Sequence, residues 1–127
     1  KGGRGKHADR WVPVTPQALK LLEAASTLQG RNKNLIPDHH NYVQWRDHAY
    51  SQWRLATAKT RIRGFHDLRA AYACERYQQI TGRPAPVLTG NKRTADRVED
   101  QNARRIIALA LGHGRPQVLQ SYIGTAQ

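Results

Sequence analysis

Apolar residues recur every three or four positions along four stretches of the chain, and this spacing predicts a mainly helical protein. The four stretches cover residues 15–30, 38–56, 66–81 and 96–111. Thr15 and Pro16 suit the N-cap and the first position of the first helix, and Gly30 is expected to end it. In the second helix Trp45 and Trp53 lie at helical spacing. We interpret both as core residues rather than as platforms for stacked bases.

The third and fourth helices have recognisable ends. The third is predicted to start near His66 and to stop at Gly82, and its apolar stripe consists of Ala70, Ala73, Cys74, Tyr77 and Ile80. A loop over residues 81–94 follows, which is long for a connection and therefore a candidate for a functional segment. The fourth helix is expected to begin at Asp96, an N-cap residue, and to run up to a glycine.

A tight turn and a short last helix follow this glycine, Gly112. A helix C-terminus favours a residue that tolerates positive φ, so we expect Gly112 to end the fourth helix and to place His113 in the turn. Pro116 suits the first position of a further helix. In that helix Tyr122 lies beside an apolar stripe, so it is either a packing residue or a functional group.

The N-terminal stretch is glycine-rich and basic, and a short β-like run follows it. Residues 1–6 read Lys-Gly-Gly-Arg-Gly-Lys, and residues 10–14 read Arg-Trp-Val-Pro-Val. This pattern predicts a small β-hairpin whose first strand is mostly missing from the sequence. The alternative is a flexible basic tail. The glycines do not match a Walker A loop.

The charge of the chain favours a polyanionic partner. The 127 residues carry 21 Lys and Arg against 9 Asp and Glu, a net charge of +12, and fifteen of the basic residues are arginine. Arginine binds phosphate through two donors at once, and neutralised phosphates release counterions. The length of the chain fits one domain. The single cysteine, Cys74, excludes an internal disulfide and fits a reducing compartment. The absence of a long apolar run predicts a soluble protein.

Several basic and histidine side chains are candidate ligands for phosphate. His66 and Arg69 share one side of the first turn of a predicted helix, whose N-terminus attracts anions. The same His-x-x-Arg spacing occurs at His7 and Arg10, so only its helical context favours the copy at His66. The histidines at positions 39, 40 and 48 lack cysteine partners and the i, i+4 pairing of a helical zinc site, so we expect no metal there.

Taken together, these motifs resemble the catalytic domain of the tyrosine recombinases, or phage-type integrases, and most of all the integrases of mobile genetic elements. The segment over residues 64–73, Gly-Phe-His-Asp-Leu-Arg-Ala-Ala-Tyr-Ala, is similar to the family's His-x-x-Arg helix start. Residues 110–113, Ala-Leu-Gly-His, are similar to its Leu-Gly-His turn, and Tyr122 falls at the position of its nucleophile. The predicted N-terminal hairpin is similar to the one that carries the catalytic lysine of the family.

The resemblance implies a mechanism. Tyr122 would attack the scissile phosphate, while Arg69 and His113 stabilise the transition state. His66 would assist proton transfer, and Lys1 would protonate the leaving 5′ oxygen; the longer hairpin leaves Lys6 as a second candidate for that lysine. Fixed cationic donors at a phosphoryl transition state act without a metal or other cofactor, and a 3′-phosphotyrosyl bond stores the energy for rejoining.

The resemblance also implies a context. The fold would be mainly α with a small N-terminal β-hairpin, a recombinase core truncated on its N-terminal side, because the family's first arginine and DNA-binding domain lie upstream. We therefore expect residues 1–127 to be one partial catalytic domain, inactive by itself, of a site-specific DNA recombinase. The expected partner is double-stranded DNA, bound by a homotetramer of the full-length protein in the bacterial cytoplasm, at the nucleoid. The residues expected to contact DNA are Arg61, Arg63, Lys92, Arg93 and Arg115.

Two alternatives to an enzyme remain open from the sequence. The first is a non-catalytic, basic DNA-binding module in which the tyrosine only fills the core. The second is an RNA-binding basic domain, which is disfavoured because none of the usual RNA-module motifs is present.

Overall fold

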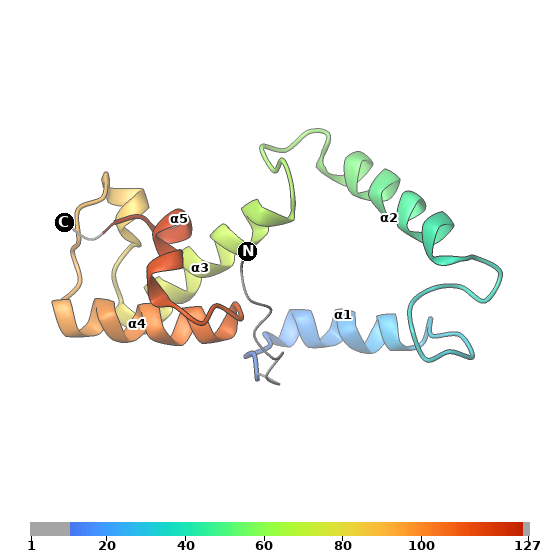
Figure 1. The fold of residues 1–127 in the computed structure, drawn as a ribbon, viewed down its shortest axis with the longest axis horizontal. Coiled ribbons are helices and arrows are strands. Elements are labelled where there is room, and N and C mark those ends of the chain that lie inside the picture. The colour runs from blue at the N-terminus through green and yellow to red at the C-terminus, as the bar shows by residue number, and fades with distance from the viewer. Residues whose placement is uncertain (1–10, 126–127) are drawn as a thin grey trace. The chain divides into compact units, whose positions relative to one another are not determined.

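A computed structural model describes residues 11–125, and every regular element in this range is helical (Figure 1). The α-helices are α1 (Pro16–Ser26), α2 (Tyr42–Thr57), α3 (Phe65–Thr81), α4 (Arg97–Ala110) and α5 (Gln120–Ile123), and the 3₁₀ turns are η1 (Pro86–Thr89) and η2 (Pro116–Leu119). The described residues divide into an N-terminal unit, Pro13–Ile62, and a C-terminal unit, which contains the residues from Arg63 onward together with Trp11 and Val12. No helix in the described range is long and apolar enough to cross a membrane.

The predicted β-hairpin is wrong in the part that the structure describes. Residues 11–14, expected as its second strand, form no strand, and the side chain of Trp11 is 99% exposed. A strand is stabilised by backbone hydrogen bonds to a neighbour, and among the described residues none pairs with this run. The expected first strand, with Lys1 and Lys6, lies outside the described residues.

Caps define both helices of the N-terminal unit. The hydroxyl of Thr15 accepts a hydrogen bond from the Ala18 backbone N–H at 3.2 Å, so α1 begins where predicted. The second helix begins at Tyr42 and not at Asp38. Its N-cap is Asn41, which forms a reciprocal capping box with Gln44. The Asp38 carboxylate instead accepts a hydrogen bond from the backbone N–H of Arg31 at 3.1 Å.

The apolar stripes of α1 and α2 do not form a buried core. Neither helix contains a buried residue. Leu21 and Leu22 are exposed, and Trp45 and Trp53 are only half-buried. The interpretation of the two tryptophans as core residues is therefore wrong as stated, although both lie on the less exposed face of α2.

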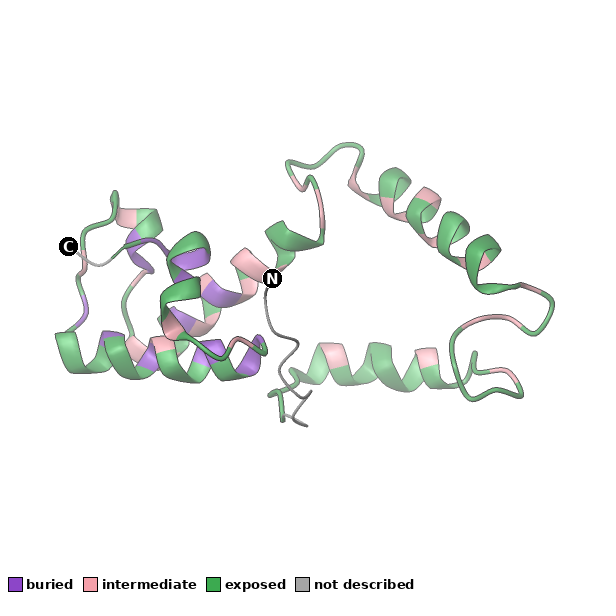
Figure 2. Cartoon of the chain, in the orientation of Figure 1, coloured by how far each residue is buried: buried purple, intermediate pink, exposed green. Residues whose placement is uncertain are grey.

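The hydrophobic core lies entirely in the C-terminal unit, where α3, α4 and α5 pack together (Figure 2). Its largest fully buried side chains are those of Tyr77, Pro86, Ile107, Leu119 and Ile123. Alanines fill much of the remaining space and allow the helices to approach closely. The stripe predicted for the third helix is confirmed, because two of its five residues are buried and the other three pack against the core.

A Schellman motif ends α4 and directs the chain into the turn. Gly112 adopts φ 73°, the left-handed conformation that was expected for it. The backbone N–H of His113 donates to the Ala108 carbonyl at 2.8 Å, and that of Gly112 donates to the Leu109 carbonyl at 3.0 Å. These two bonds fix where His113 leaves the helix.

Candidate active site

Four predicted site residues come together in the C-terminal unit. His66 and Arg69 lie in the first two turns of α3, His113 follows α4, and Tyr122 lies on α5. Arg69 and His113 are 44 positions apart in the sequence, yet their side chains are in contact. The fold thus places all four polar side chains in one cluster, although three separate segments carry them.

Local contacts set the start of α3. Gly64 is the N-cap and is extended, with φ −173° and no side chain to cap the helix. The Asp67 carboxylate reaches back instead and accepts a hydrogen bond from the backbone N–H of Arg63 at 2.6 Å. This contact fixes the approach of the chain to α3, and with it the position of His66.

The guanidinium of Arg69 connects α3 to the turn after α4. Its Nη2 atom donates to the backbone carbonyl of Leu111 at 2.7 Å and lies 3.3 Å from Nε2 of His113. Arginine carries only donors, so in this contact the guanidinium can donate to a ring nitrogen of His113 that carries no proton. An arginine carries five N–H donors, so one side of the guanidinium can be held by Leu111 while other donors bind an anion.

The ring of Tyr122 packs against both histidines. Its centroid lies 4.8 Å from that of His66 and 5.7 Å from that of His113, with the rings tilted by 37° and 31°. Only 6% of Tyr122 is exposed. The Cys74 thiol donates a weak hydrogen bond to the Tyr122 carbonyl at 3.6 Å, so the backbone of α5 is also in contact with α3.

A buried polar network holds the segment that follows Tyr122. The Tyr77 hydroxyl donates to one carboxylate oxygen of Asp100 at 2.8 Å, and Nε of Arg104 donates to the other at 2.9 Å. Both Nη atoms of Arg104 donate to the Gly124 carbonyl at 3.1 Å. We call these four residues the anchor network. It links α3, α4 and the end of α5 in one chain of hydrogen bonds.

The anchor network has two physical signatures. Burial raises the pKa of Tyr77 strongly, and the hydrogen bond to the Asp100 carboxylate adds to this, so the phenol stays protonated as a donor. Gly124 has φ 82° and is buried, and a Cβ atom there would meet the Asn91 side chain and the backbone N of Val87. Only glycine therefore fits between Arg104 and η1 at this position.

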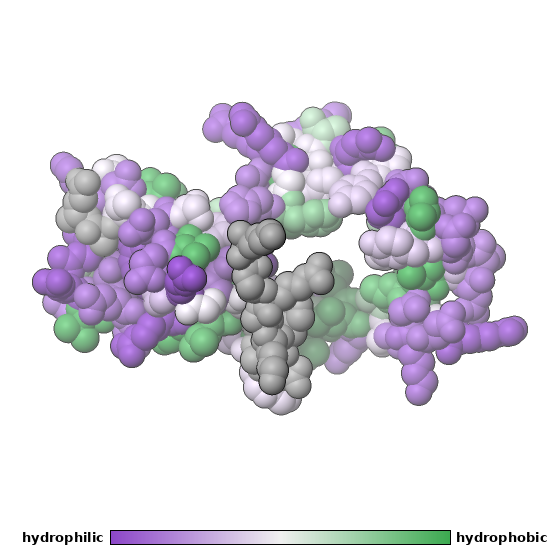
Figure 3. All heavy atoms as spheres, viewed as in Figure 1, coloured by the Kyte–Doolittle hydropathy of each residue, from purple (hydrophilic) through white to green (hydrophobic). Residues whose placement is uncertain are grey.

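Within residues 11–125, the five residues expected to contact DNA form no hydrogen bond or ring contact with the Tyr122 cluster. Arg61 lies at the end of the N-terminal unit, Arg63 and Lys92 are exposed in the C-terminal unit, and Arg115 is the exposed N-cap of η2. Arg93 is half-buried and lines a cleft beside α4. Figure 3 shows hydrophilic side chains over much of the visible face of the C-terminal unit.

Two of the three histidines of the N-terminal unit, His39 and His40, lie side by side. The rings of His39 and His40 lie 4.4 Å apart, centroid to centroid. In the described range, no group of three or more His, Cys, Asp or Glu residues gathers in a way that could hold a metal ion.

The sequence interpretation missed the anchor network and the arginines of α4. The arginines had a detectable signal, because Arg97, Gln101, Arg104 and Arg105 follow the i, i+4, i+7, i+8 spacing of one helix face. The partnership of Tyr77 with Asp100 had none, because the two residues are 23 positions apart and meet only through packing.

No protein-family model matches this chain, and neither a curated protein nor a solved structure is significantly similar to it. Any function assigned to the protein therefore rests on its own residues and their geometry.

Proposed function

We propose that the C-terminal unit is the catalytic part of a tyrosine-type DNA recombinase, in which Tyr122 is the nucleophile. The observation that supports this proposal is the convergence of His66, Arg69, His113 and Tyr122 from three segments of the chain. Chance matches to short motifs would not be expected to join these side chains by three contacts, Arg69 with His113, His113 with Tyr122, and Tyr122 with His66.

The geometry suits phosphoryl transfer. The hydroxyl oxygen of Tyr122 would form a bond to the scissile phosphorus, while the bond from phosphorus to the 5′ oxygen breaks and leaves a 3′-phosphotyrosyl link. Charge grows on the non-bridging oxygens in such a step, and preorganised cationic donors stabilise it. Arg69, held by the Leu111 carbonyl, can donate to these oxygens, and His113 can join it once its Nε2 atom carries a proton.

Proton transfer has a candidate on each side of the reaction. The tyrosine hydroxyl is protonated at neutral pH and must lose its proton as it attacks. His66, whose ring packs against that of Tyr122, would assist this loss. The proton for the leaving 5′ oxygen would come from Lys1 or Lys6, which lie outside the described residues.

The decisive experiment is trapping of the covalent intermediate. The assay uses a full-length protein that contains this chain and the upstream arginine that the resemblance implies. Its substrate is a nicked duplex from which the short strand with the 5′ hydroxyl is lost after cleavage. We expect an adduct that survives denaturation and disappears in Tyr122→Phe. Tyr42→Phe is a matched control, because Tyr42 lies in the N-terminal unit, outside the cluster. An adduct of undiminished yield in Tyr122→Phe would refute the proposed nucleophile.

A non-catalytic DNA-binding module is the second candidate, and the burial of Tyr122 favours it because a packing tyrosine is buried in the same way. Arg69→Ala separates the two. In a recombinase it lowers cleavage by about a hundredfold or more while DNA affinity changes by less than about tenfold. In a binding module it changes mainly the affinity and its dependence on salt.

A further inference from the structure

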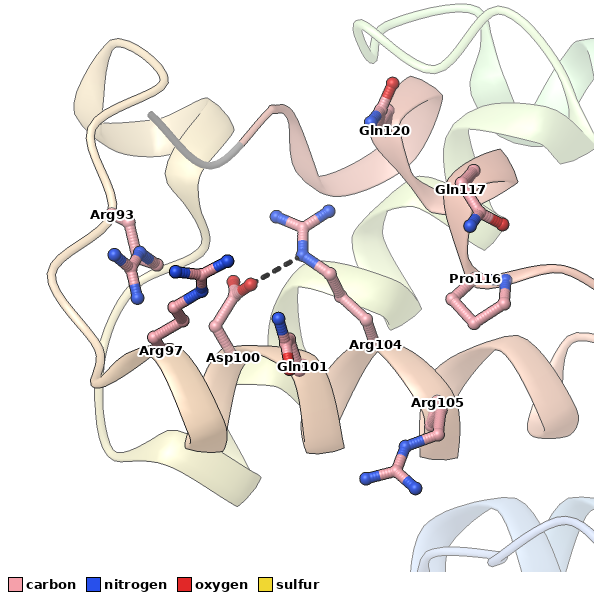
Figure 4. Close-up of a pocket in the computed structure, with 9 residues that line it drawn as sticks. All are labelled: Arg93, Arg97, Asp100, Gln101, Arg104, Arg105, Pro116, Gln117 and Gln120. Carbon is pink, nitrogen blue, oxygen red and sulfur yellow. Dashed lines mark hydrogen bonds and ion pairs between the residues drawn. The ribbon is translucent and has the colours of Figure 1, made fainter.

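A cleft beside α4 lies apart from the Tyr122 cluster. It encloses about 560 Å³, and none of the four clustered side chains lines it. Four arginines contribute to its walls: Arg93, Arg97, Arg104 and Arg105. Figure 4 shows Arg93 and Arg97 toward the N-terminal end of α4 and Arg105 further along the helix. The cleft is therefore a second concentration of positive charge in the C-terminal unit.

Most of this charge is not neutralised within the protein. Asp100 is the one acidic residue in the lining, and it is paired with Arg104 at 2.9 Å. In the described part of the chain, no hydrogen bond or ion pair engages the guanidinium groups of Arg93, Arg97 or Arg105. Four cationic groups against one carboxylate leave the lining with a net charge of +3. Arg93 interacts electrostatically with the nearby Asp96 carboxylate, so within the described residues Arg97 and Arg105 are the two lining arginines whose guanidinium groups have no acidic partner.

We propose that this cleft binds the phosphodiester backbone of a nucleic acid segment, at a site separate from the Tyr122 cluster. Arg97 and Arg105 are eight residues apart on one helix, which corresponds to about 12 Å along its axis. That separation spans about three to four nucleotides of one duplex strand. Guanidinium groups match phosphate oxygens in a bidentate manner, so the two ends of the cleft can hold different phosphates of one strand.

The rest of the lining favours nucleic acid over an acidic protein segment. Three glutamines complete the polar wall, namely Gln101, Gln117 and Gln120, and their amides both donate and accept. Pro116 is the one apolar residue of the lining. Protein partners are usually anchored by aromatic or aliphatic side chains in apolar pockets, and this cleft offers none. A sugar–phosphate backbone needs no such anchor.

The test measures binding of a fluorescent 20-base-pair duplex to the 127-residue chain as a function of salt. Arg97→Glu/Arg105→Glu removes two cleft arginines, both of them exposed and unpaired in the described range. The matched control is Arg54→Glu/Arg83→Glu, which changes the net charge equally at exposed arginines outside the cleft. Circular dichroism verifies that both variants keep their helices.

We expect the slope of log affinity against log salt to become shallower by about 1.8 in the cleft variant, since each lost phosphate contact removes about 0.9. Between 50 and 200 mM salt the wild type would then lose about twelvefold more affinity than the cleft variant. The control should keep most of the wild-type slope. Equal slopes in the two variants would overturn the proposal, because the effect would then reflect overall charge.

Two further arms identify the ligand and separate this site from the catalytic one. A polyglutamate peptide that binds as tightly as the duplex at the same salt, and loses binding in the cleft variant, would overturn the assignment to nucleic acid. The titration repeated with Tyr122→Phe should give the wild-type slope. The binding measurement does not depend on adduct formation, so failure of either proposal can be recognised without the other.

Discussion

The anchor network makes a sharp prediction about one hydroxyl group, that of Tyr77. Tyr77→Phe removes the donor at 2.8 Å from the Asp100 carboxylate and leaves the ring in place. Asp100 is only 4% exposed, so water cannot freely replace the lost donor. A hydrogen bond to a charged group contributes about 1.5–3 kcal/mol, and one carboxylate oxygen would remain buried without it. We expect the variant to lose about 2 kcal/mol of the free energy of unfolding.

The chain provides a matched control on the same helix. The hydroxyl oxygen of Tyr72 is also buried, but it has no hydrogen-bond partner among the described residues. Tyr72→Phe makes the same chemical change without breaking a bond, so we expect a stability within about 0.5 kcal/mol of the wild type, or slightly above it. The difference between the two variants isolates the hydrogen bond from the general effect of removing a phenolic oxygen.

Urea denaturation followed by circular dichroism measures both variants. For a small domain the expected loss corresponds to a fall in the midpoint of about 1 M for Tyr77→Phe, with an unchanged slope. The midpoint of Tyr72→Phe should stay near that of the wild type. If Tyr77→Phe unfolds at the same urea concentration as Tyr72→Phe, the bond to Asp100 does not stabilise the fold and the reasoning is refuted.

The remaining predictions concern Gly124, which lies in the segment after Tyr122, and Cys74 on α3. Gly124→Ala should lower the thermal midpoint of unfolding more than Gly82→Ala does. Both glycines have positive φ, but only a Cβ atom at position 124 would meet the Val87 backbone, at 2.8 Å. Equal losses in the two variants would contradict the close approach at Gly124. Cys74 should react with maleimide more slowly than in the unfolded chain and titrate at higher pH, because burial raises its pKa and keeps the thiol protonated. If Cys74 reacted with maleimide as fast in the native protein as in the unfolded chain, this prediction would be contradicted.

Local signals predicted several helix ends, but the predicted end of the first helix is wrong, because α1 stops at Ser26, with Thr27 as its C-cap, and not at Gly30. Thr15 caps α1, and Gly82 and Gly112 adopt the left-handed conformation that ends α3 and α4. Each of these features depends on residues within about one helical turn, so a short window of sequence contains the cause. The second helix shows the limit of such signals. Asp38 and Asn41 are both good N-caps, and the reciprocal partner of Asn41 decided between them.

Periodicity predicted which face of a helix is apolar but not what covers it. The stripe of α3 is buried because α4 and α5 pack on it. The leucines of α1 follow the same spacing and remain exposed, with Leu21 at 72%. Nothing within either stretch distinguishes these outcomes, because burial depends on distant segments. Residues 11–14 form no strand for a similar reason, because a strand also depends on a partner from another segment.

The candidate site was predictable only as a set of residues in order along the chain. His66, Arg69, His113 and Tyr122 were identified by motif resemblance, while their mutual contacts are properties of the fold. Nothing in the sequence indicated that Arg69 would be held by the Leu111 carbonyl. Backbone acceptors have no sequence signature, so such positioning contacts are visible only in a structure.

The position of Tyr122 must come from tertiary contacts rather than from its own helix. α5 has four residues, Gln120–Ile123, and a single helical turn is not stable alone. Leu119 and Ile123 fix it by burial on the core, and Arg104 fixes its end through the Gly124 carbonyl. Arg104 is itself held by the Asp100 carboxylate. We therefore expect that a substitution that weakens the anchor network also displaces the Tyr122 side chain, although the effect is indirect. Stability and tyrosine placement are thus coupled through one set of hydrogen bonds.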